Sequence, residues 1–132
     1  MIVVDTSALV AVVLGEPEAE EFLHVLVHHD IVVSAATLTE ARIVLHVRQG
    51  LDALRDLDEL LEECGAQIAP YDERDALTAH AAWARYGKGR HPAGLNLGDC
   101  MSYAMARRVQ APLLFKGDDF TRTDLEDARR TT

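Results

Sequence analysis

The chain has 132 residues, of which 48% are apolar and 27% charged, a composition typical of one globular domain. No apolar run approaches the roughly 20 residues of a membrane-spanning helix. The first ten residues, MIVVDTSALV, lack the basic start of a secretory signal. The two cysteines, Cys64 and Cys100, are too few for a disulfide framework and favour free thiols. We therefore expect a single domain over residues 1–132, located in the cytoplasm, without membrane contact.

The formal net charge of -9 argues against a protein that coats nucleic acid without specificity. The charge is unevenly distributed, however. Residues 1–75 contain four arginines and sixteen acidic residues, whereas residues 76–132 contain nine basic and six acidic residues. Between Ala76 and Gly117 the only acidic residue is Asp99. A carboxylate in a basic neighbourhood suits a cation bound beside a phosphate backbone, although each basic residue alone is typical of a solvated surface.

Apolar runs and helical spacing predict alternating strands and helices along the chain. In chain order, the first half has a strand at 2–4, helices at 6–14 and 16–29, a strand at 31–33, and helices at 36–49 and 51–64. The second half has a short strand at 68–69, a helix at 72–86, a loop at 87–98, a helix from 98 or 99 to 109, and a strand at 113–115.

Short strands separated by helices predict an α/β fold, a three-layer α/β/α sandwich with a short parallel central sheet. In such sheets the functional site lies beyond the carboxyl ends of the strands. Asp5 directly follows the first predicted strand, and Asp118 and Asp119 follow the last. These acids are therefore candidate site residues.

Two further acids, Glu40 and Asp99, are candidate site residues because of their positions on predicted helices. Glu40 has apolar neighbours at helical spacing, so its carboxylate lies at the edge of the core, where an unpaired charge is costly. The alternative is an ion pair with Arg42 or Arg48. Asp99 opens a predicted helix, where the helix dipole alone would stabilise it by about 0.3–1 kcal/mol. For Asp5, the alternative to a role in the site is that it caps the following helix.

Taken together, the acids form a stronger signal than any one of them. Mg²⁺ and similar hard cations prefer oxygen ligands, and no His/Cys cluster favours zinc. We interpret His28 and His29 as surface residues, because neighbouring helical residues point about 100° apart. Several carboxylates at strand ends predict a Mg²⁺ or Mn²⁺ site that activates water for attack on a phosphodiester.

Three segments, IVVDTSALVAVV, NLGDCMSYAMA and LLFKGDDFTRTD, with Glu40 between them, resemble the PIN-domain family. The resemblance is to its VapC-type ribonuclease toxins, from bacterial type II toxin–antitoxin pairs, and covers nearly the whole chain. It implies a single PIN-like domain over residues 1–132, a divalent-metal site and metal-dependent endoribonuclease activity.

The resemblance also implies roles for individual residues. Asp5, Glu40 and Asp99 match the first three acids of the family, and Asp5 and Asp99 would hold the metal. The hydroxyl residue that sits beside the metal in the family maps onto Thr6 and Ser7.

The fourth acid is less well defined by the resemblance. The family pattern is T-x-D-x-D-F, whereas residues 115–120 read FKGDDF, without the threonine and with one residue fewer before the phenylalanine. We choose Asp118 as the fourth catalytic acid, with Asp119 as the alternative.

The segment YGKGRHPAGLNLGD resembles a subgroup of these toxins and offers Lys88, Arg90 and His91 to hold an RNA backbone, with an ordinary surface loop as the alternative. The resemblance implies three partners: an RNA substrate, a second copy in a homodimer and an antitoxin. The antitoxin would cover apolar surface between the early helices and place an arginine in the acidic site. The alternatives are a non-catalytic PIN-like binding module, a housekeeping metal-dependent nuclease, and a phosphatase or DNA nuclease on the same scaffold.

Overall fold

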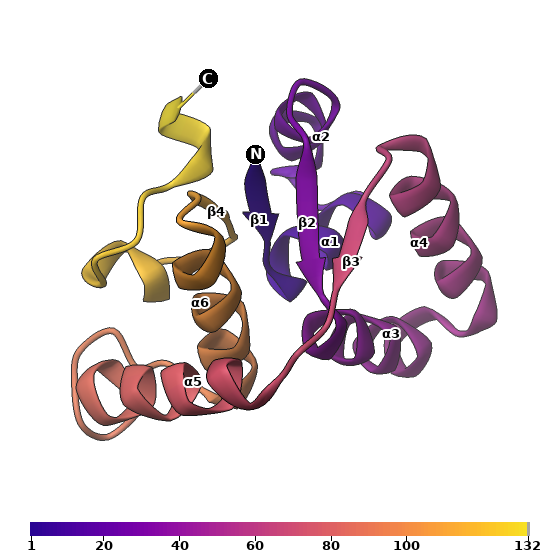
Figure 1. Ribbon diagram of the computed structural model, residues 1–132. Helices are drawn as coiled ribbons and strands as arrows, with labels where there is room; N and C mark the ends of the chain where they lie inside the picture. Colours follow the sequence, from indigo (N-terminus) through magenta and orange to yellow (C-terminus); the bar gives the residue numbers. More distant parts are fainter. Residues whose placement is uncertain (132) are drawn as a thin grey trace.

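A four-stranded parallel sheet forms the middle layer of the protein (Figure 1). The structure is a computed structural model and describes residues 1–131. The strand order is β3-β2-β1-β4. The strands are β1 (Ile2–Val4), β2 (Ile31–Ser34), β3 (Gln67–Ala69) and β4 (Leu113–Leu114). The predicted parallel sheet is confirmed, with strand ends that differ by one residue.

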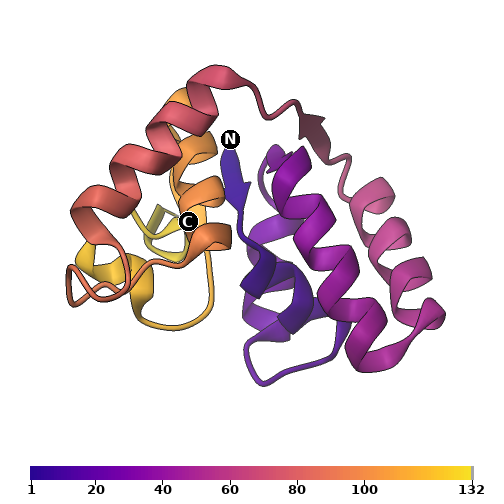
Figure 2. The ribbon, with the colours of Figure 1, turned by 90° about the horizontal axis from the view of Figure 1, so that it is seen from below.

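Helices cover both faces of this sheet, as Figures 1 and 2 show from two directions. On one face lie α1 (Thr6–Val13), α2 (Ala19–Val27), α3 (Ala35–Gln49) and α4 (Leu51–Glu63). On the other face lie α5 (Glu73–Tyr86) and α6 (Leu97–Val109). Two short 3₁₀ helices, η1 (Asp119–Arg122) and η2 (Ala128–Thr131), follow β4. The predicted α/β/α sandwich is therefore confirmed.

The short central strand β1 joins the two cores. Ile2 and Val4 pack into the core beneath α1 to α4, whereas Val3 packs into the core beneath α5 and α6. This alternation follows from the two-residue period of a strand. All three side chains are essentially fully buried, so the strand has no polar face.

The strand order also locates a functional site. From β1 the chain proceeds to β2 and β3 on one side and returns to place β4 on the other side. The direction of winding therefore reverses between β1 and β4, the position at which open α/β sheets bind ligands beyond the strand ends. Asp5 lies there, and its backbone N–H donates to the carbonyl of Leu114 at 2.9 Å.

Four helix starts differ from the sequence predictions, those of α3 and α5 by one residue only. Helix α2 begins at Ala19 rather than at residue 16, because residues 17 and 18 form a turn. Helix α6 begins at Leu97 with Asn96 as its N-cap, so the preceding loop is shorter than predicted. Both cysteines are free, as predicted. Within residues 1–131, the helices are too short or too polar to cross a bilayer.

Candidate active site

Asp5 is buried at the end of β1, with 3% of its surface exposed. It caps α1, and its Oδ2 accepts hydrogen bonds from the backbone N–H of Ser7 at 3.0 Å and from the Ser7 hydroxyl at 2.6 Å. Its Oδ1 accepts from the hydroxyl of Ser102 at 2.5 Å. The alternative considered for Asp5, the cap of the following helix, is thus confirmed. These hydrogen bonds fix both carboxylate oxygens and make burial of the charge tolerable.

The sequence analysis missed Ser102, which supports Asp5 from α6. Its side chain is fully buried and also hydrogen-bonds to the hydroxyl of Thr37 on α3, at 3.1 Å. The chain Thr37–Ser102–Asp5 therefore connects α3, α6 and the end of β1. Ser102 lies three residues after Asp99 on the same helix, so the helical spacing was the signal that could have identified it.

Glu40 on α3 is held from α1 and lies against α6. Its Oε1 accepts from the Thr6 hydroxyl at 2.5 Å. A Cβ atom added to Gly98 would lie only 2.5 Å from Cδ of Glu40, so the missing side chain at residue 98 makes room for the carboxylate. The alternative of an ion pair with Arg42 or Arg48 is wrong, because those arginines pair with Asp58 and Glu16, respectively.

Asp99 lies in the first turn of α6, at the third helical position and not at the helix start. Its backbone N–H donates to the Asn96 side chain at 2.9 Å, and its Oδ2 accepts from the backbone N–H of Asn96 at 3.1 Å. This reciprocal capping box orients the carboxylate. Burial raises the pKa of Asp99 to about 7, helped by the negative charges of Asp5 and Asp119.

The same interactions bear on the choice of the fourth acid. The Asp99 carboxyl interacts with the side chain of Asp119, which begins the 3₁₀ helix η1. The carbonyl of Asp118 accepts from both the N–H and the hydroxyl of Thr121, and its side chain is exposed. Both side chains are exposed, so the interaction with Asp99 alone favours Asp119, the alternative in the sequence analysis, over Asp118, the first choice.

The first three predicted acids, Asp5, Glu40 and Asp99, line one open pocket of about 330 Å³. Two cations also line it, but both pair with acids at its rim. Lys116 lies 3.3 Å from Glu16, and Arg48 lies 3.7 Å from the same carboxylate. Within residues 1–131, Asp5, Glu40 and Asp99 form no ion pair, and their negative charge remains uncompensated.

The donor set of this pocket fits a hard divalent cation. Carboxylate and hydroxyl oxygens surround it, and Mg²⁺ is commonly held by only one or two carboxylates together with waters and substrate phosphates. In the described part of the chain, no three His, Cys, Asp or Glu side chains converge closely enough to form a complete protein cage. The arrangement thus suits a cation that shares its ligands with water and substrate.

The side chains predicted to hold RNA from the basic loop, Lys88, Arg90 and His91, do not line this pocket. The Arg90 side chain donates to the carbonyl of Ala84 at 3.1 Å, and Nδ1 of His91 accepts from the N–H of Ala93 at 3.0 Å. These two side chains therefore hold the loop in shape. Lys88 is exposed, and it forms no ion pair with any residue between 1 and 131.

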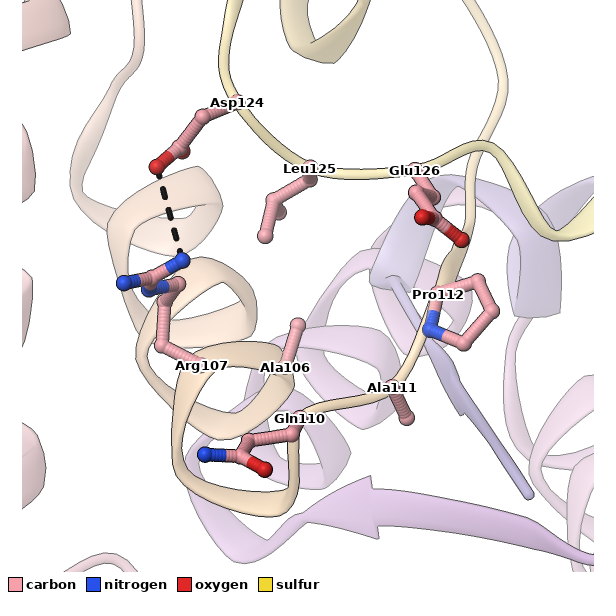
Figure 3. A pocket seen from close by; sticks show the side chains of 8 residues that line it. All are labelled: Ala106, Arg107, Gln110, Ala111, Pro112, Asp124, Leu125 and Glu126. Carbon is pink, nitrogen blue, oxygen red and sulfur yellow. Dashed lines mark ion pairs between the residues drawn. The ribbon is translucent and has the colours of Figure 1, made fainter.

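A second cavity, of about 320 Å³, lies at the amino end of β4 and is drawn in Figure 3. Ala111 and Pro112, which precede that strand, contribute to its wall. Here Arg107 pairs with Asp124 at 3.5 Å, and the Tyr103 hydroxyl donates to the same carboxylate at 2.7 Å. The Asp124 carboxylate is compensated, in contrast to Asp5, Glu40 and Asp99 at the other end of the sheet.

Comparison with known proteins agrees with this geometry. The PIN domain family matches residues 2–126. Ribonuclease VapC30 of Mycobacterium tuberculosis is 44% identical over 124 residues, which cover 93% of this chain and 95% of that protein. Ribonuclease VapC of Mycolicibacterium smegmatis is 46% identical over 125 residues, with 93% and 96% covered.

A solved structure also matches the fold. The crystal structure of Mycobacterium tuberculosis VapC20, described as a sarcin-ricin loop cleaving toxin, superposes with a TM-score of 0.78. It covers 95% of this chain and 96% of that chain at 17% sequence identity, and so bears on the fold alone. On the family match and the sequence identities together, the chain belongs to the PIN-domain family and, within it, to the VapC ribonucleases.

Proposed function

We propose that this protein is a divalent-metal-dependent endoribonuclease and the toxin of a type II toxin–antitoxin pair. The observation that carries the proposal is the group of uncompensated carboxylates at the switch point of the sheet, from Asp5, Glu40 and Asp99. Relatives at 44–46% identity that are named ribonucleases support the reaction class.

In this proposal Asp5 and Asp99 hold Mg²⁺ or Mn²⁺. Such an ion, when bound, neutralises charge on the phosphodiester and lowers the pKa of a water molecule. Ser7 and Ser102 fix the Asp5 carboxylate in advance of binding. Glu40, held by Thr6, and Asp119 complete the ring of acids and orient the attacking water. If η1 shifts by one residue, Asp118, the choice made from the sequence, replaces Asp119 in orienting the water.

The hydroxyls that bind Asp5 and Glu40, and the capping box that contains Asp99, preorganise these carboxylates. The hydroxyls that hold Asp5 and Glu40 come from two helices: Thr6 and Ser7 lie on α1, and Ser102 lies on α6. The capping box gives Asp99 the same restraint. Groups fixed before the substrate arrives need no reorganisation during the reaction, which lowers the barrier.

The proposed partners follow from the family and from exposed apolar surface. Leu23 and Val27 on α2 are 41% and 60% exposed. We expect the antitoxin to cover this surface and to insert an arginine among the acids, where bidentate hydrogen bonds to carboxylates are strong. We also expect a homodimer, acting in the cytoplasm. The non-catalytic module is disfavoured, because all four acid positions are filled.

The direct test is cleavage by the purified protein of a single-stranded RNA and of the DNA of the same sequence. We expect cleavage of RNA with Mg²⁺ or Mn²⁺ and none in EDTA. Asp58→Asn, which changes an exposed acid far from the pocket, serves as the matched control. Cleavage that persists in EDTA would exclude a metal mechanism, and preferential cleavage of DNA would favour the nuclease alternative.

The toxin role needs a separate test in cells. Expression of this chain alone should arrest growth, and co-expression of the small protein encoded beside it should relieve the arrest. Arrest should require Asp5 and Asp99. If expression is harmless while the purified protein cuts RNA readily, the housekeeping nuclease becomes the better assignment.

A further inference from the structure

An apolar pocket adjoins the acid site on the face of α5. It has a volume of about 440 Å³, and aromatic rings form much of its wall. Tyr71, His80 and Trp83 line it, together with Leu97, which is 70% exposed. Neither the acids nor the proposed reaction uses this pocket. Exposed apolar surface of this kind marks binding sites for ligands or partners.

The aromatic wall is held in place by its surroundings. The rings of His80 and Trp83 are nearly parallel, with an interplanar angle of 19° and centroids 6.2 Å apart. The Arg90 guanidinium lies 4.8 Å from the centre of the indole. Gly87 packs so closely that a Cβ there would lie 2.6 Å from Cδ1 of Trp83. The indole is thus ordered although 42% of its surface is exposed.

The pocket is connected to the acid site through a single residue. Asn96 lines both cavities, and its side chain accepts a hydrogen bond from the backbone N–H of Asp99 at 2.9 Å. The two cavities therefore share a wall, and a polymer bound at Asp99 can continue past Asn96 into the apolar pocket. This adjacency distinguishes the pocket from the cavity of Figure 3, at the far end of the sheet.

The charge around the pocket favours a negatively charged polymer. Lys88 lies at the pocket and, in contrast to Lys116, has no carboxylate partner within residues 1–131. Along the sequence, Asp99 is the only acid between Ala76 and Gly117. Free cationic groups beside aromatic rings are the combination by which proteins bind single-stranded nucleic acid, with bases on the rings and phosphates at the cations.

We propose that this pocket binds an unpaired nucleobase of the RNA, next to the phosphodiester at the acid site, with Lys88 at the adjoining phosphate. The proposal rests on the ribonuclease function and adds a requirement: the substrate must be unpaired at that nucleotide. A base stacked inside a duplex cannot enter the pocket, so the site selects single-stranded segments or loops.

Trp83 is the only tryptophan in the chain, so its fluorescence reports directly on the pocket. We would titrate the Asp99→Asn protein, which should cleave RNA at least about a hundredfold more slowly than the wild type, with a mixed-sequence ten-nucleotide RNA. The single-stranded form should quench Trp83 emission to saturation. The same RNA annealed to its complement should quench it far less at equal concentration.

Kinetics then test the role of the ring in an otherwise native protein. Trp83→Ala should raise KM for single-stranded RNA about tenfold, since stacking on an aromatic ring contributes that order of affinity per base, and leave kcat nearly unchanged. Trp83→Phe should keep most of the affinity. Leu77→Ala, an exposed apolar change on the same helix but outside the pocket, should have no effect.

The outcomes separate the two proposals. If the wild type cuts RNA but Trp83 emission does not respond and Trp83→Ala has a normal KM, the base pocket is wrong and the ribonuclease stands. Quenching by RNA without any cleavage would support the pocket and overturn the ribonuclease. Emission that changes with protein concentration alone, together with loss of a dimer in Trp83→Ala, would identify a surface for a second copy and overturn the pocket.

Discussion

Two buried aspartates, Asp5 and Asp75, differ in how the protein compensates their charge. Asp75 is 1% exposed at the start of α5, accepts from the backbone N–H of Asp72 at 2.9 Å, and lies 3.3 Å from the Arg108 guanidinium. Asp5 is 3% exposed and accepts three hydrogen bonds from serines, but no cation of residues 1–131 pairs with it.

The difference separates an acid that stabilises the fold from one that is available for chemistry. A buried carboxylate that pairs with an internal arginine has no free charge to offer a ligand. Asp5 shares the pocket with Asp99, whose pKa is raised mainly by burial and further by the negative charges of Asp5 and Asp119. Such a cluster favours a cation from solvent, and it lies at the open end of the sheet.

The largest expected effect is the loss of RNA cleavage when one of the acids Asp5, Glu40 and Asp99 is replaced. Asp99→Asn should reduce RNA cleavage about a hundredfold or more, because a metal site contributes several kcal/mol to the transition state. In EDTA its melting temperature should equal or exceed that of the wild type, since one of several repelling charges is removed.

Asp5→Asn should reduce cleavage similarly but should also lower stability, because its amide cannot accept from both Ser7 and Ser102 as the carboxylate does. We expect a loss of about 1–2 kcal/mol in the free energy of unfolding. Equal melting temperatures for the Asp5 and Asp99 variants would show that the serine hydrogen bonds contribute nothing to the fold.

For Asp75, whose charge Arg108 compensates, we expect a loss of stability without a loss of activity. Asp75→Asn leaves Arg108, whose side chain is 22% exposed, without its buried partner. Breaking such a pair should cost about 2 kcal/mol in the free energy of unfolding, measured in urea. Cleavage per folded molecule should stay unchanged.

Asp58→Asn is the control for that variant, because it breaks an exposed pair with Arg42 and should cost no more than about 0.5 kcal/mol. If Asp75→Asn instead abolishes cleavage without loss of stability, the distinction between the two aspartates fails.

Most of the fold could be predicted because the information is local. Three-residue apolar runs and helical spacing predict the strands and helices, and the rule for parallel sheets selects Asp5 at the end of β1. The helix predicted at 72–86 is confirmed as α5, with Asp72 as its N-cap. Element ends were less accurate, as at α6, where the Asn96–Asp99 capping box determines the start.

The rest of the site depends on contacts between distant parts of the chain. Ser102 and Asp5 are 97 residues apart; the helical spacing from Asp99 places Ser102 on the same face of α6, but it does not indicate that Ser102 binds Asp5. The choice between Asp118 and Asp119 depends on where η1 begins, and a 3₁₀ turn has no strong sequence signal. A one-residue difference there changes which carboxylate faces Asp99.

That one-residue difference gives the next prediction. Asp119→Asn should lower cleavage about tenfold, the order expected for a group that orients the reacting water rather than holding the metal, whereas Asp118→Asn should change it less than about twofold. Both residues are exposed, so the two variants should melt alike. A stronger effect at Asp118 would restore the assignment made from the sequence.

The smallest expected effect concerns Gly98, at the contact of α6 with Glu40. A methyl group there would overlap the Glu40 carboxylate, which lies at the end of a flexible side chain and can move. Gly98→Ala should therefore displace the carboxylate from Thr6 and lower cleavage several-fold. Stability should hold or rise by up to about 1 kcal/mol, because alanine favours a helix over glycine.

A second substitution tests whether the cause is the displaced carboxylate. In Gly98→Ala/Glu40→Asp the shorter side chain withdraws from the added methyl, so the double variant should be no less active than Glu40→Asp alone. That non-additivity is expected only for residues in direct contact. If the two effects simply multiply, the methyl acts elsewhere on α6, for instance through Asp99, and the close approach of Glu40 to Gly98 has no part in the reaction.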